Sequence, residues 1–327
     1  APQPLFLTIV EVEFMDVGRD RYFLPLTIGS QAEAQAIRER AGHAVLANIT
    51  GARKGVLFDA WLDDTFARTL LEAIERNEQV RTRLGSIRAT GSPALPAPRG
   101  VEDLPPRRLS ADQSNTSITY GDRLILKLFR RLEEGVNPDY EIGRFLTERT
   151  TFKRAPALLG GLEHAGIAEH HSTIGILQEL IESQGDGWTH ATDDVRRFYD
   201  AVQSRPVPTV PRLRYSELVA AEPEPQVSEV IGGYVETAER LGRRTAEMHL
   251  ALASDASDPA FAPEPFTQED YAAVLSSATA EAQKAFELLE KQPTLAPDLL
   301  QQRERVLERL RPGATLEFTS SKIRIHG

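Results

Sequence analysis

The 327-residue chain contains no cysteine. Disulfide bonds, thiolate catalysis and zinc sites with cysteine ligands are therefore excluded. The chain also lacks an apolar run long enough to cross a membrane, and it has no secretory signal at its start. These absences are consistent with a reducing cytoplasm, where we expect the protein to be located, without a membrane partner.

The chain also has fewer basic residues than acidic ones. The chain has 38 Lys and Arg against 48 Asp and Glu, which gives a formal net charge of -10. Nucleic acids and anionic membranes are bound by clustered basic side chains, so neither is an expected partner. With 41% hydrophobic and 26% charged residues, the composition is that of a folded globular protein.

Several catalytic motifs are absent as well. The sequence has no Walker-type phosphate loop, no dinucleotide-binding fingerprint and no serine-hydrolase elbow. The adjacent residues His170 and His171 do not share a face of a strand or helix, so they indicate a surface turn rather than a metal site. We therefore predict no metal ligand among the residues present.

The first 84 residues predict a small α+β module. Strands are expected at 5–15, 20–28, 43–49 and 55–59 from their alternation and their β-branched and aromatic residues. Asp63 and Asp64 then open a helix with one apolar stripe, because acidic residues favour the positive end of the helix dipole.

A second module follows the proline-rich stretch 85–108, which indicates a linker or an irregular edge. It contains two predicted strands, SITYG and RLILKLF, joined by a tight turn at Gly121-Asp122. A helix from about Pro138 to Arg149 comes next, and further strands are expected near 157–164 and 173–182. Beyond a second proline-rich breaker, helices are expected at 231–252, 268–291 and 298–311. A β-rich part followed by an α-rich part is the layout of kinase-like phosphotransferases, although fold does not dictate function.

The stretch 113–117 is the first candidate site. Its small hydroxyl and amide side chains are Gln113, Ser114, Asn115, Thr116 and Ser117. At a turn between strands, such residues can aim backbone N–H groups and hydroxyls at phosphate oxygens. Considered alone, the same composition is more often that of a polar surface turn.

Lys127 and Glu141 form the second candidate site. Lys127 lies within an apolar run that predicts a strand, and considered alone it fits an edge lysine that reaches water. Glu141 alone fits a solvated, locally paired side chain. Asn137-Pro138 is a good helix start, however, and it places Glu141 in the first turns of a helix that could pack on the Lys127 strand. This order favours the lysine–glutamate pair that holds the lysine on ATP phosphates in protein kinases.

Two later segments fit the same layout. Residues 173–188 predict a strand that enters a polar turn, where a kinase-like chain crosses between lobes, and Gln178, Glu179 and Leu180 would bind adenine there. Residues 322–327, KIRIHG, predict a short strand that ends in His-Gly. In many phosphotransferases such a strand delivers the aspartate that accepts the proton of the substrate hydroxyl. His326 alone also fits a packed or capping histidine.

The stretch DQSNTSITYGDRLILKLFRRLEEGVNPDYEIGRFL closely resembles the nucleotide-binding lobe of bacterial maltokinases, including the kinase part of trehalose synthase–maltokinase fusions. The resemblance extends to YFLPL, LQELIESQGDGW, LGRRTAEMH and IRIHG, and so covers essentially the whole chain. It implies an α+β, protein-kinase-like bilobal fold of the aminoglycoside phosphotransferase type. The domains would be an N-terminal cap module at 1–84, a β-rich nucleotide-binding lobe at 85–183 and a partial α-helical lobe at 184–327.

The resemblance also implies a function. The enzyme would transfer the γ-phosphoryl group of ATP to maltose, giving maltose 1-phosphate for bacterial α-glucan, glycogen and trehalose metabolism. ATP and Mg²⁺ are the implied cofactors, and a trehalose synthase domain or subunit is the implied partner. By the same resemblance, Lys127 would be the phosphate-binding lysine and Glu141 its partner. The phosphate loop would be 113–117, and the adenine-binding crossing 178–180.

The sequence departs from this family at both ends. Family members begin with an earlier segment that contains an RWF-type stretch, and they continue past His-Gly into a loop with the catalytic aspartate and a second, metal-binding aspartate. These segments are absent here. We therefore expect the chain to be truncated at both ends and inactive by itself.

Two alternatives remain open. The first is a related phosphotransferase that acts on an aminoglycoside or choline, since a net charge of -10 suits a cationic acceptor. The cap module argues against it, because those enzymes resemble the chain only in the kinase lobes. The second is a non-catalytic scaffold that binds a nucleotide or a partner protein.

Overall fold

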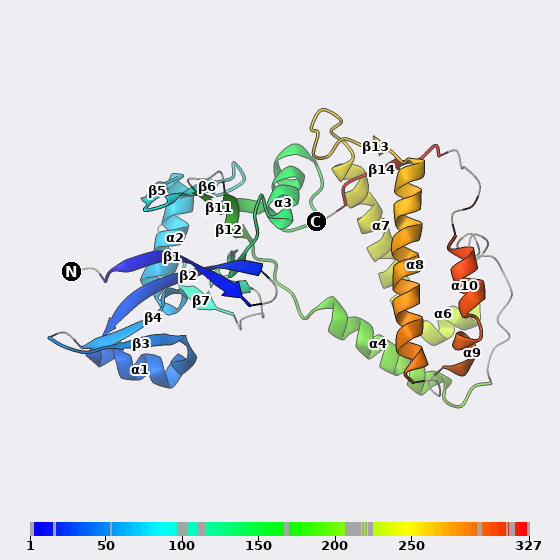
Figure 1. Ribbon diagram of the computed structural model, residues 1–327, viewed down its shortest axis with the longest axis horizontal. Helices are drawn as coiled ribbons and strands as arrows, with labels where there is room; N and C mark the ends of the chain where they lie inside the picture. Colours follow the sequence, from blue (N-terminus) through cyan, green and yellow to red (C-terminus); the bar gives the residue numbers. More distant parts are fainter. Residues whose placement is uncertain are drawn as a thin grey trace. The chain divides into compact units, whose positions relative to one another are not determined.

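The strands of the N-terminal part of the chain form two antiparallel sheets (Figure 1). The computed structural model describes residues 3–15, 18–52, 54–96, 104–109, 115–166, 170–206, 225–292, 296–311 and 318–325, with single residues at 217, 219, 221 and 313. These residues divide into two units, Ala1–Ala251 (unit 1) and Leu252–Ile325 (unit 2). Both sheets belong to unit 1. The division into domains at 84 and 183 stays a prediction.

The first sheet has five strands. Its order is β1 (Leu5–Phe14), β2 (Gly18–Ser30), β4 (Gly55–Asp59) and β3 (Val45–Ile49), and β10 (Arg131–Leu132) also pairs with β2. Helix α1 (Gln31–Ala41) packs on β4, with Ala34 and Ile37 against Val56 and Phe58. The sequence did not predict α1, because its only large apolar residue is Ile37 and its other apolar residues are alanines.

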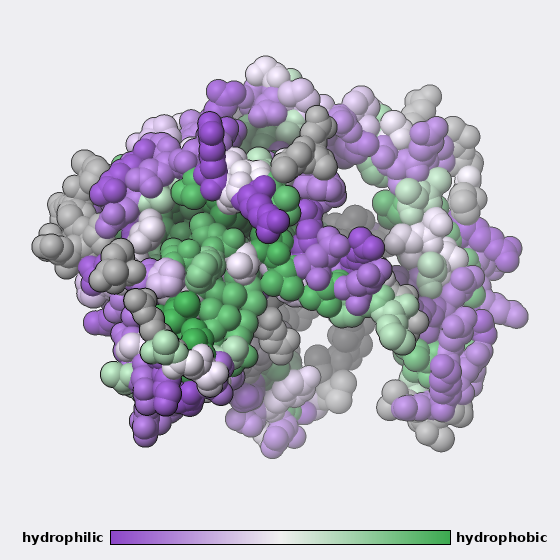
Figure 2. Space-filling view, turned by 60° about the vertical axis from the view of Figure 1, so that its left-hand side comes forward, coloured by the Kyte–Doolittle hydropathy of each residue, from purple (hydrophilic) through white to green (hydrophobic). Residues whose placement is uncertain are grey.

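Strand β1 lies at the edge of this sheet. Glu11 pairs with Arg19, whereas Phe6, Val10 and Phe14 are exposed on the other face of the strand. The alternation correctly predicted the strand, but both of its faces reach the surface near residues 10–14. Figure 2 shows a broad hydrophobic area on the side of the molecule that comes forward in this view.

The second sheet has seven strands. Their order is β5 (Gln79–Thr82), β6 (Gly85–Gly91), β11 (Leu158–Gly166), β12 (His171–Glu179), β9 (Leu124–Phe129), β8 (Asn115–Tyr120) and β7 (Pro106–Arg108). The predicted strands at SITYG, RLILKLF, 157–164 and 173–182 are confirmed. Strand β6 was missed, because its small residues GSIRATG carry little local strand signal and its conformation comes from pairing with β5 and β11.

Helix α2 (Asp64–Arg76) covers one face of the seven-stranded sheet. Asp63 caps it by accepting hydrogen bonds from the backbone N–H groups of Thr65 and Phe66 at 2.6 and 3.4 Å, which confirms the predicted helix start. Leu71 and Ile74 are fully buried in the main core, with Ile118, Leu126 and Leu162 of the sheet. Each fully buried side chain of this size stabilises the fold by roughly 2 kcal/mol.

Helix α3 (Pro138–Arg149) covers the opposite face, and its bounds match the prediction. Tyr140 packs there with Phe129, Leu158 and Ile176. Gly161 allows this contact, because a Cβ atom at this position would lie 2.3 Å from the Tyr140 ring. Burial, followed by the nearby Glu163 carboxylate, raises the pKa of Tyr140.

The remainder of the described chain is mainly helical. Unit 1 continues with α4 (Gly187–Val202), α6 (Pro225–Ile231) and α7 (Tyr234–Leu252), whose last residue begins unit 2. Unit 2 contains β13 (Glu264–Pro265), α8 (Gln268–Glu290), α9 (Pro297–Leu300), α10 (Arg303–Arg309) and β14 (Ser321–Lys322). The helix predicted at 268–291 is confirmed, and the one at 231–252 is confirmed from Tyr234 onward. The one predicted at 298–311 is divided into α9 and α10.

The strand predicted at KIRIHG is confirmed only at Lys322. The strand residues are Ser321 and Lys322 of β14, opposite Pro265 and Glu264 of β13, and residues 323–325 lie outside the strand. Local alternation alone does not form a strand, because a strand requires a hydrogen-bonding neighbour over its length. His326 and Gly327 lie outside the described residues.

Candidate functional site

Lys127 lies in β9, in the interior of the seven-stranded sheet. It is opposite Ser117 of β8 and Ile176 of β12. Directly opposite residues of antiparallel strands point to the same face. Because Ile176 packs against Tyr140 of α3, Lys127 is on the face that α3 covers. The alternative of an edge lysine is therefore excluded, and the Lys127 side chain is half-buried.

Glu141 occupies the first turn of α3. The Asn137 side chain caps this helix by accepting a hydrogen bond from the Asp139 backbone at 2.9 Å, and Pro138 occupies the first position. The backbone N–H of Asn137 also donates to the Thr173 hydroxyl of β12 at 2.9 Å, which fixes the start of α3 on the sheet. The structure thus places Lys127 and the Glu141 helix on one face. A direct ion pair between the two side chains stays a prediction.

Three of the five predicted phosphate-loop residues are described, because Gln113 and Ser114 lie outside the described residues. Asn115 and Ser117 pair with Phe129 and Lys127, and so share the face of Lys127. Thr116 points the opposite way. It is buried, and its hydroxyl accepts a hydrogen bond from Arg130 Nε at 2.7 Å.

The predicted adenine-binding residues lie at the end of β12. Gln178 and Glu179 are its last two residues, and Leu180 follows them. The backbone N–H of Glu179 donates to Ala157 at 3.0 Å, and that of Leu180 donates to Arg123 at 2.8 Å. These two donors are already used within the protein. A base bound here would therefore have to use carbonyl groups of this segment or groups further along the chain.

A small hollow opens beside the first residues of β8 and the last residue of β9. Its volume is about 300 Å³, and it is lined by Asn115, Phe129, Arg131, Glu133, Glu134, Gly135, Val136, Asn137 and Thr173. Ligand pockets begin at about this size. Sequence reasoning did not select Thr173 or the loop 133–136. The local sequence does not indicate these residues, because the loop reaches the hollow through a contact with a distant strand. The Gly135 N–H donates a hydrogen bond to the His171 carbonyl of β12, at 2.7 Å.

Two other hollows are present, and Lys127 lines none of the three. One, of about 390 Å³, is lined by charged residues that include Glu11, Arg19 and His170. The other, of about 520 Å³, lies between α1 and the start of α2. Across the described ranges, no three His, Asp or Glu side chains come together as metal ligands do. None of the helices in the same ranges combines the length and the apolar character that a membrane span needs.

No protein-family model matches the chain. A solved structure of glucosamine kinase, crystal form A, is similar with a TM-score of 0.51 and 20% sequence identity, over 94% of this chain and 57% of that chain. The fold of the chain is therefore similar to that of this glucosamine kinase. This confirms the predicted fold class at that level, with mixed α and β structure and antiparallel sheets, while the bilobal arrangement and the cap module stay predictions.

Two further structures of glucosamine kinase give lower scores. The complex with glucosamine, ADP and inorganic phosphate has a TM-score of 0.48 and 19% identity, over 94% of this chain and 60% of that chain. Crystal form B has a TM-score of 0.44 and 19% identity, over 91% and 57%. The chain thus spans less than two thirds of the length of each of these structures. At such identities the likeness concerns the fold.

Proposed function

We propose that the chain is the nucleotide-binding part of an ATP-dependent sugar phosphotransferase. The observation that carries this proposal is the position of Lys127. A half-buried lysine stands in an inner strand, on the face covered by the helix that contains Glu141, within a chain of kinase-like fold. Phosphoryl transfer depends on positioning and on neutralising phosphate charge, and a lysine fixed in a sheet serves both needs.

In this proposal, the described residues bind and orient ATP. The Lys127 ammonium group would contact phosphate oxygens, and Glu141 would hold the lysine in position. Asn115 and Ser117, on the same face, would add polar contacts. Mg²⁺ would supply further charge neutralisation, but the described residues offer no ligand cluster for it. We therefore derive no step that passes through the metal.

We further propose maltose as the acceptor, with maltose 1-phosphate as the product. This step rests on the resemblance of the sequence to maltokinases, as do the association with a trehalose synthase domain and the location in the cytoplasm. The glucosamine kinase fold adds a second acceptor to test, because that kinase shares the fold at 20% identity. A choline or aminoglycoside acceptor is an alternative outcome of the same assay.

The first test is ATP binding by calorimetry, with Lys127→Met beside wild type. Loss of the ammonium group should weaken ATP binding by about tenfold or more, since a charge-assisted contact contributes roughly 1.5–3 kcal/mol. Lys153→Met is the matched control, because Lys153 is exposed and lies outside the strands and helices. It should leave the affinity unchanged. A wild-type chain that binds no ATP, or a Lys127→Met variant that binds it normally, would contradict the proposal.

The acceptor is tested separately in the full-length protein, by following ATP consumption with maltose, glucosamine, glucose, choline and an aminoglycoside. Maltose-dependent turnover that is lost in Lys127→Met would support the maltokinase assignment. Turnover with glucosamine instead would support the phosphotransferase activity but would identify glucosamine, not maltose, as the acceptor. ATP binding without turnover on any acceptor would favour the alternative of a non-catalytic scaffold that binds a nucleotide.

A further inference from the structure

Strands β7 and β8 are both bound to one short segment, residues 59–64. This segment joins β4 to α2. Strand β7 ends at Arg108, and β8 begins at Asn115. Each strand reaches the segment 59–64 through an arginine.

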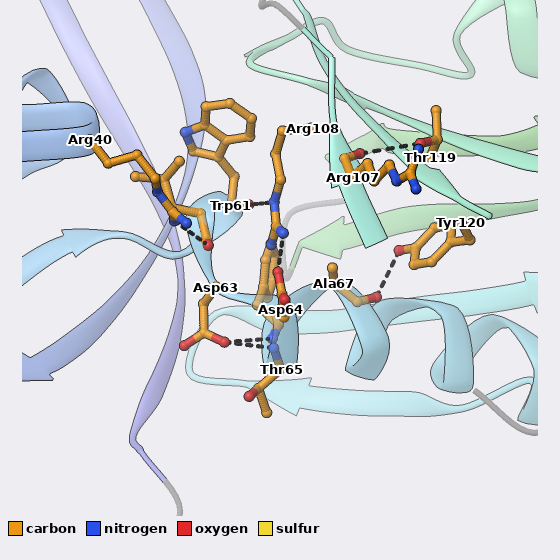
Figure 3. Close-up of polar contacts among 12 residues, drawn as sticks. Arg40, Trp61, Asp63, Asp64, Thr65, Ala67, Arg107, Arg108, Thr119 and Tyr120 are labelled. Carbon is orange, nitrogen blue, oxygen red and sulfur yellow. Dashed lines mark hydrogen bonds and ion pairs between the residues drawn. The ribbon is translucent and has the colours of Figure 1, made fainter. Parts of the chain in front are cut away.

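Arg108 makes the first of these connections (Figure 3). Its Nε donates to the carbonyl oxygen of Trp61 at 2.9 Å, and its guanidinium forms an ion pair with Asp64. The Arg108 side chain is only 16% exposed. Two contacts from a planar guanidinium fix both the position and the orientation of the end of β7.

Arg130, directly after β9, makes the second connection. It forms an ion pair with Asp59 at 2.8 Å, and its Nε donates to the Thr116 hydroxyl at 2.7 Å. The Arg130 and Asp59 side chains are 20% and 12% exposed. Burial raises the pKa of Asp59, while the Arg130 charge acts in the opposite direction. The start of β8 is therefore attached to segment 59–64 through Arg130.

The segment 59–64 is itself firmly held. Asp59 also accepts a hydrogen bond from the Trp61 N–H at 3.1 Å, and Asp63 caps α2. One turn into α2, the Ala67 carbonyl accepts a hydrogen bond from the fully buried Tyr120 hydroxyl at 2.7 Å, from the far end of β8 (Figure 3). Strand β8 is thus bound to this part of the chain at both of its ends.

We propose that segment 59–64 positions β7 and β8 for phosphate binding, with Arg108 and Arg130 as positioning residues. The inference rests on the proposed function. Neither arginine needs to touch the nucleotide. Arg130 fixes Thr116, whose neighbours Asn115 and Ser117 point to the Lys127 face, and Ser117 lies directly opposite Lys127. A shift of this strand end would move those groups away from the phosphates while leaving the end of β12, at Gln178 and Glu179, in place.

The test compares ATP with adenosine in binding experiments on Arg130→Lys and Arg108→Lys. Lysine keeps the charge but cannot contact two partners in one plane. ATP affinity should fall by about tenfold, because a displaced strand end would weaken contacts to the phosphates, and a charge-assisted contact contributes roughly 1.5–3 kcal/mol. Adenosine affinity should stay unchanged, since adenosine lacks the phosphates. A purely structural role would weaken both ligands alike.

Arg76→Lys is the matched control. The Arg76 side chain is 64% exposed, and its ion-pair partners Glu72 and Glu78 lie outside segment 59–64. This variant should bind ATP as wild type does. Thermal unfolding of each variant checks the fold, and Asp64→Asn, at a 61% exposed carboxylate, provides a variant of the Arg108 connection with little risk to folding.

The outcomes separate the two proposals. Selective loss of ATP affinity in Arg130→Lys, and in Arg108→Lys or Asp64→Asn, would support positioning. Unchanged ATP binding, or an equal loss of ATP and adenosine, in folded variants would overturn positioning and leave the nucleotide site intact. A wild-type chain that binds neither ligand would overturn the proposed function, and the positioning role with it.

Discussion

Ser172 and Thr173 are neighbours on β12 that differ in one respect. Both are buried, with 1% and 3% exposure. The Thr173 hydroxyl accepts a hydrogen bond from the Asn137 N–H at 2.9 Å, whereas the Ser172 hydroxyl has no partner among the described residues. A buried polar group without a partner lowers stability, while a satisfied one contributes to it.

We therefore predict opposite results for Thr173→Val and Ser172→Ala. Thr173→Val preserves the shape but leaves the N–H at the start of α3 unsatisfied, so the free energy of unfolding should fall by about 1–2 kcal/mol. Ser172→Ala should leave it unchanged or raise it slightly. Urea unfolding of both variants measures this difference. A larger loss in Ser172→Ala than in Thr173→Val would contradict the argument.

At the scale of elements, the contacts at the start of α8 make the stability of unit 2 depend on pH. Asp270 accepts from the hydroxyl and the N–H of Thr267 at 2.7 and 2.8 Å, and it also pairs with Lys322 of β14 at 3.0 Å. The Thr267 bonds, followed by Lys322, lower the pKa of Asp270 from 3.8 to about 2. Its ionised form therefore stabilises unit 2 above about pH 4, and this contribution is lost as the pH falls towards 2.

Asp270→Asn should consequently lower the thermal midpoint of unit 2 at pH 7, and the difference from wild type should shrink between pH 4 and 2. Circular dichroism across this range measures both effects. Glu269→Gln is the control, because Glu269 is an exposed acid of the same helix turn outside the capping box. A difference between Asp270→Asn and wild type that stays the same from pH 4 to pH 2 would show that the charge is not the cause.

Elements with local signals were predictable from the sequence, and those formed by distant partners were not. Helix α3 was predicted because Asn137 and Pro138 form a start signal within the helix itself. Strand β6 was missed because its neighbours β5 and β11 provide its structure. The same holds within the candidate site. Alternation correctly predicted the strand of Lys127, but nothing near Thr116 in the sequence indicated that Arg130 would turn its hydroxyl towards segment 59–64.

At the scale of the whole chain, every described residue of the candidate site belongs to unit 1. The two tryptophans of the chain, Trp61 and Trp188, belong to unit 1 as well. Tryptophan fluorescence thus follows unit 1, whereas far-ultraviolet circular dichroism also detects α8 in unit 2. The two signals can therefore locate the effect of a nucleotide within the chain.

ATP should raise the thermal midpoint detected by tryptophan fluorescence. At a concentration of 100 times the dissociation constant, the native state gains about 2.7 kcal/mol. For a unit of this size that corresponds to a shift of roughly 5–10 °C. The circular dichroism component of unit 2 should keep its midpoint, because no described candidate residue lies there. The shift should disappear in Lys127→Met. If the unit 2 component moved with the fluorescence transition, residues of unit 2 would have to contribute to nucleotide binding, and the site would extend beyond the one derived from β8, β9 and α3.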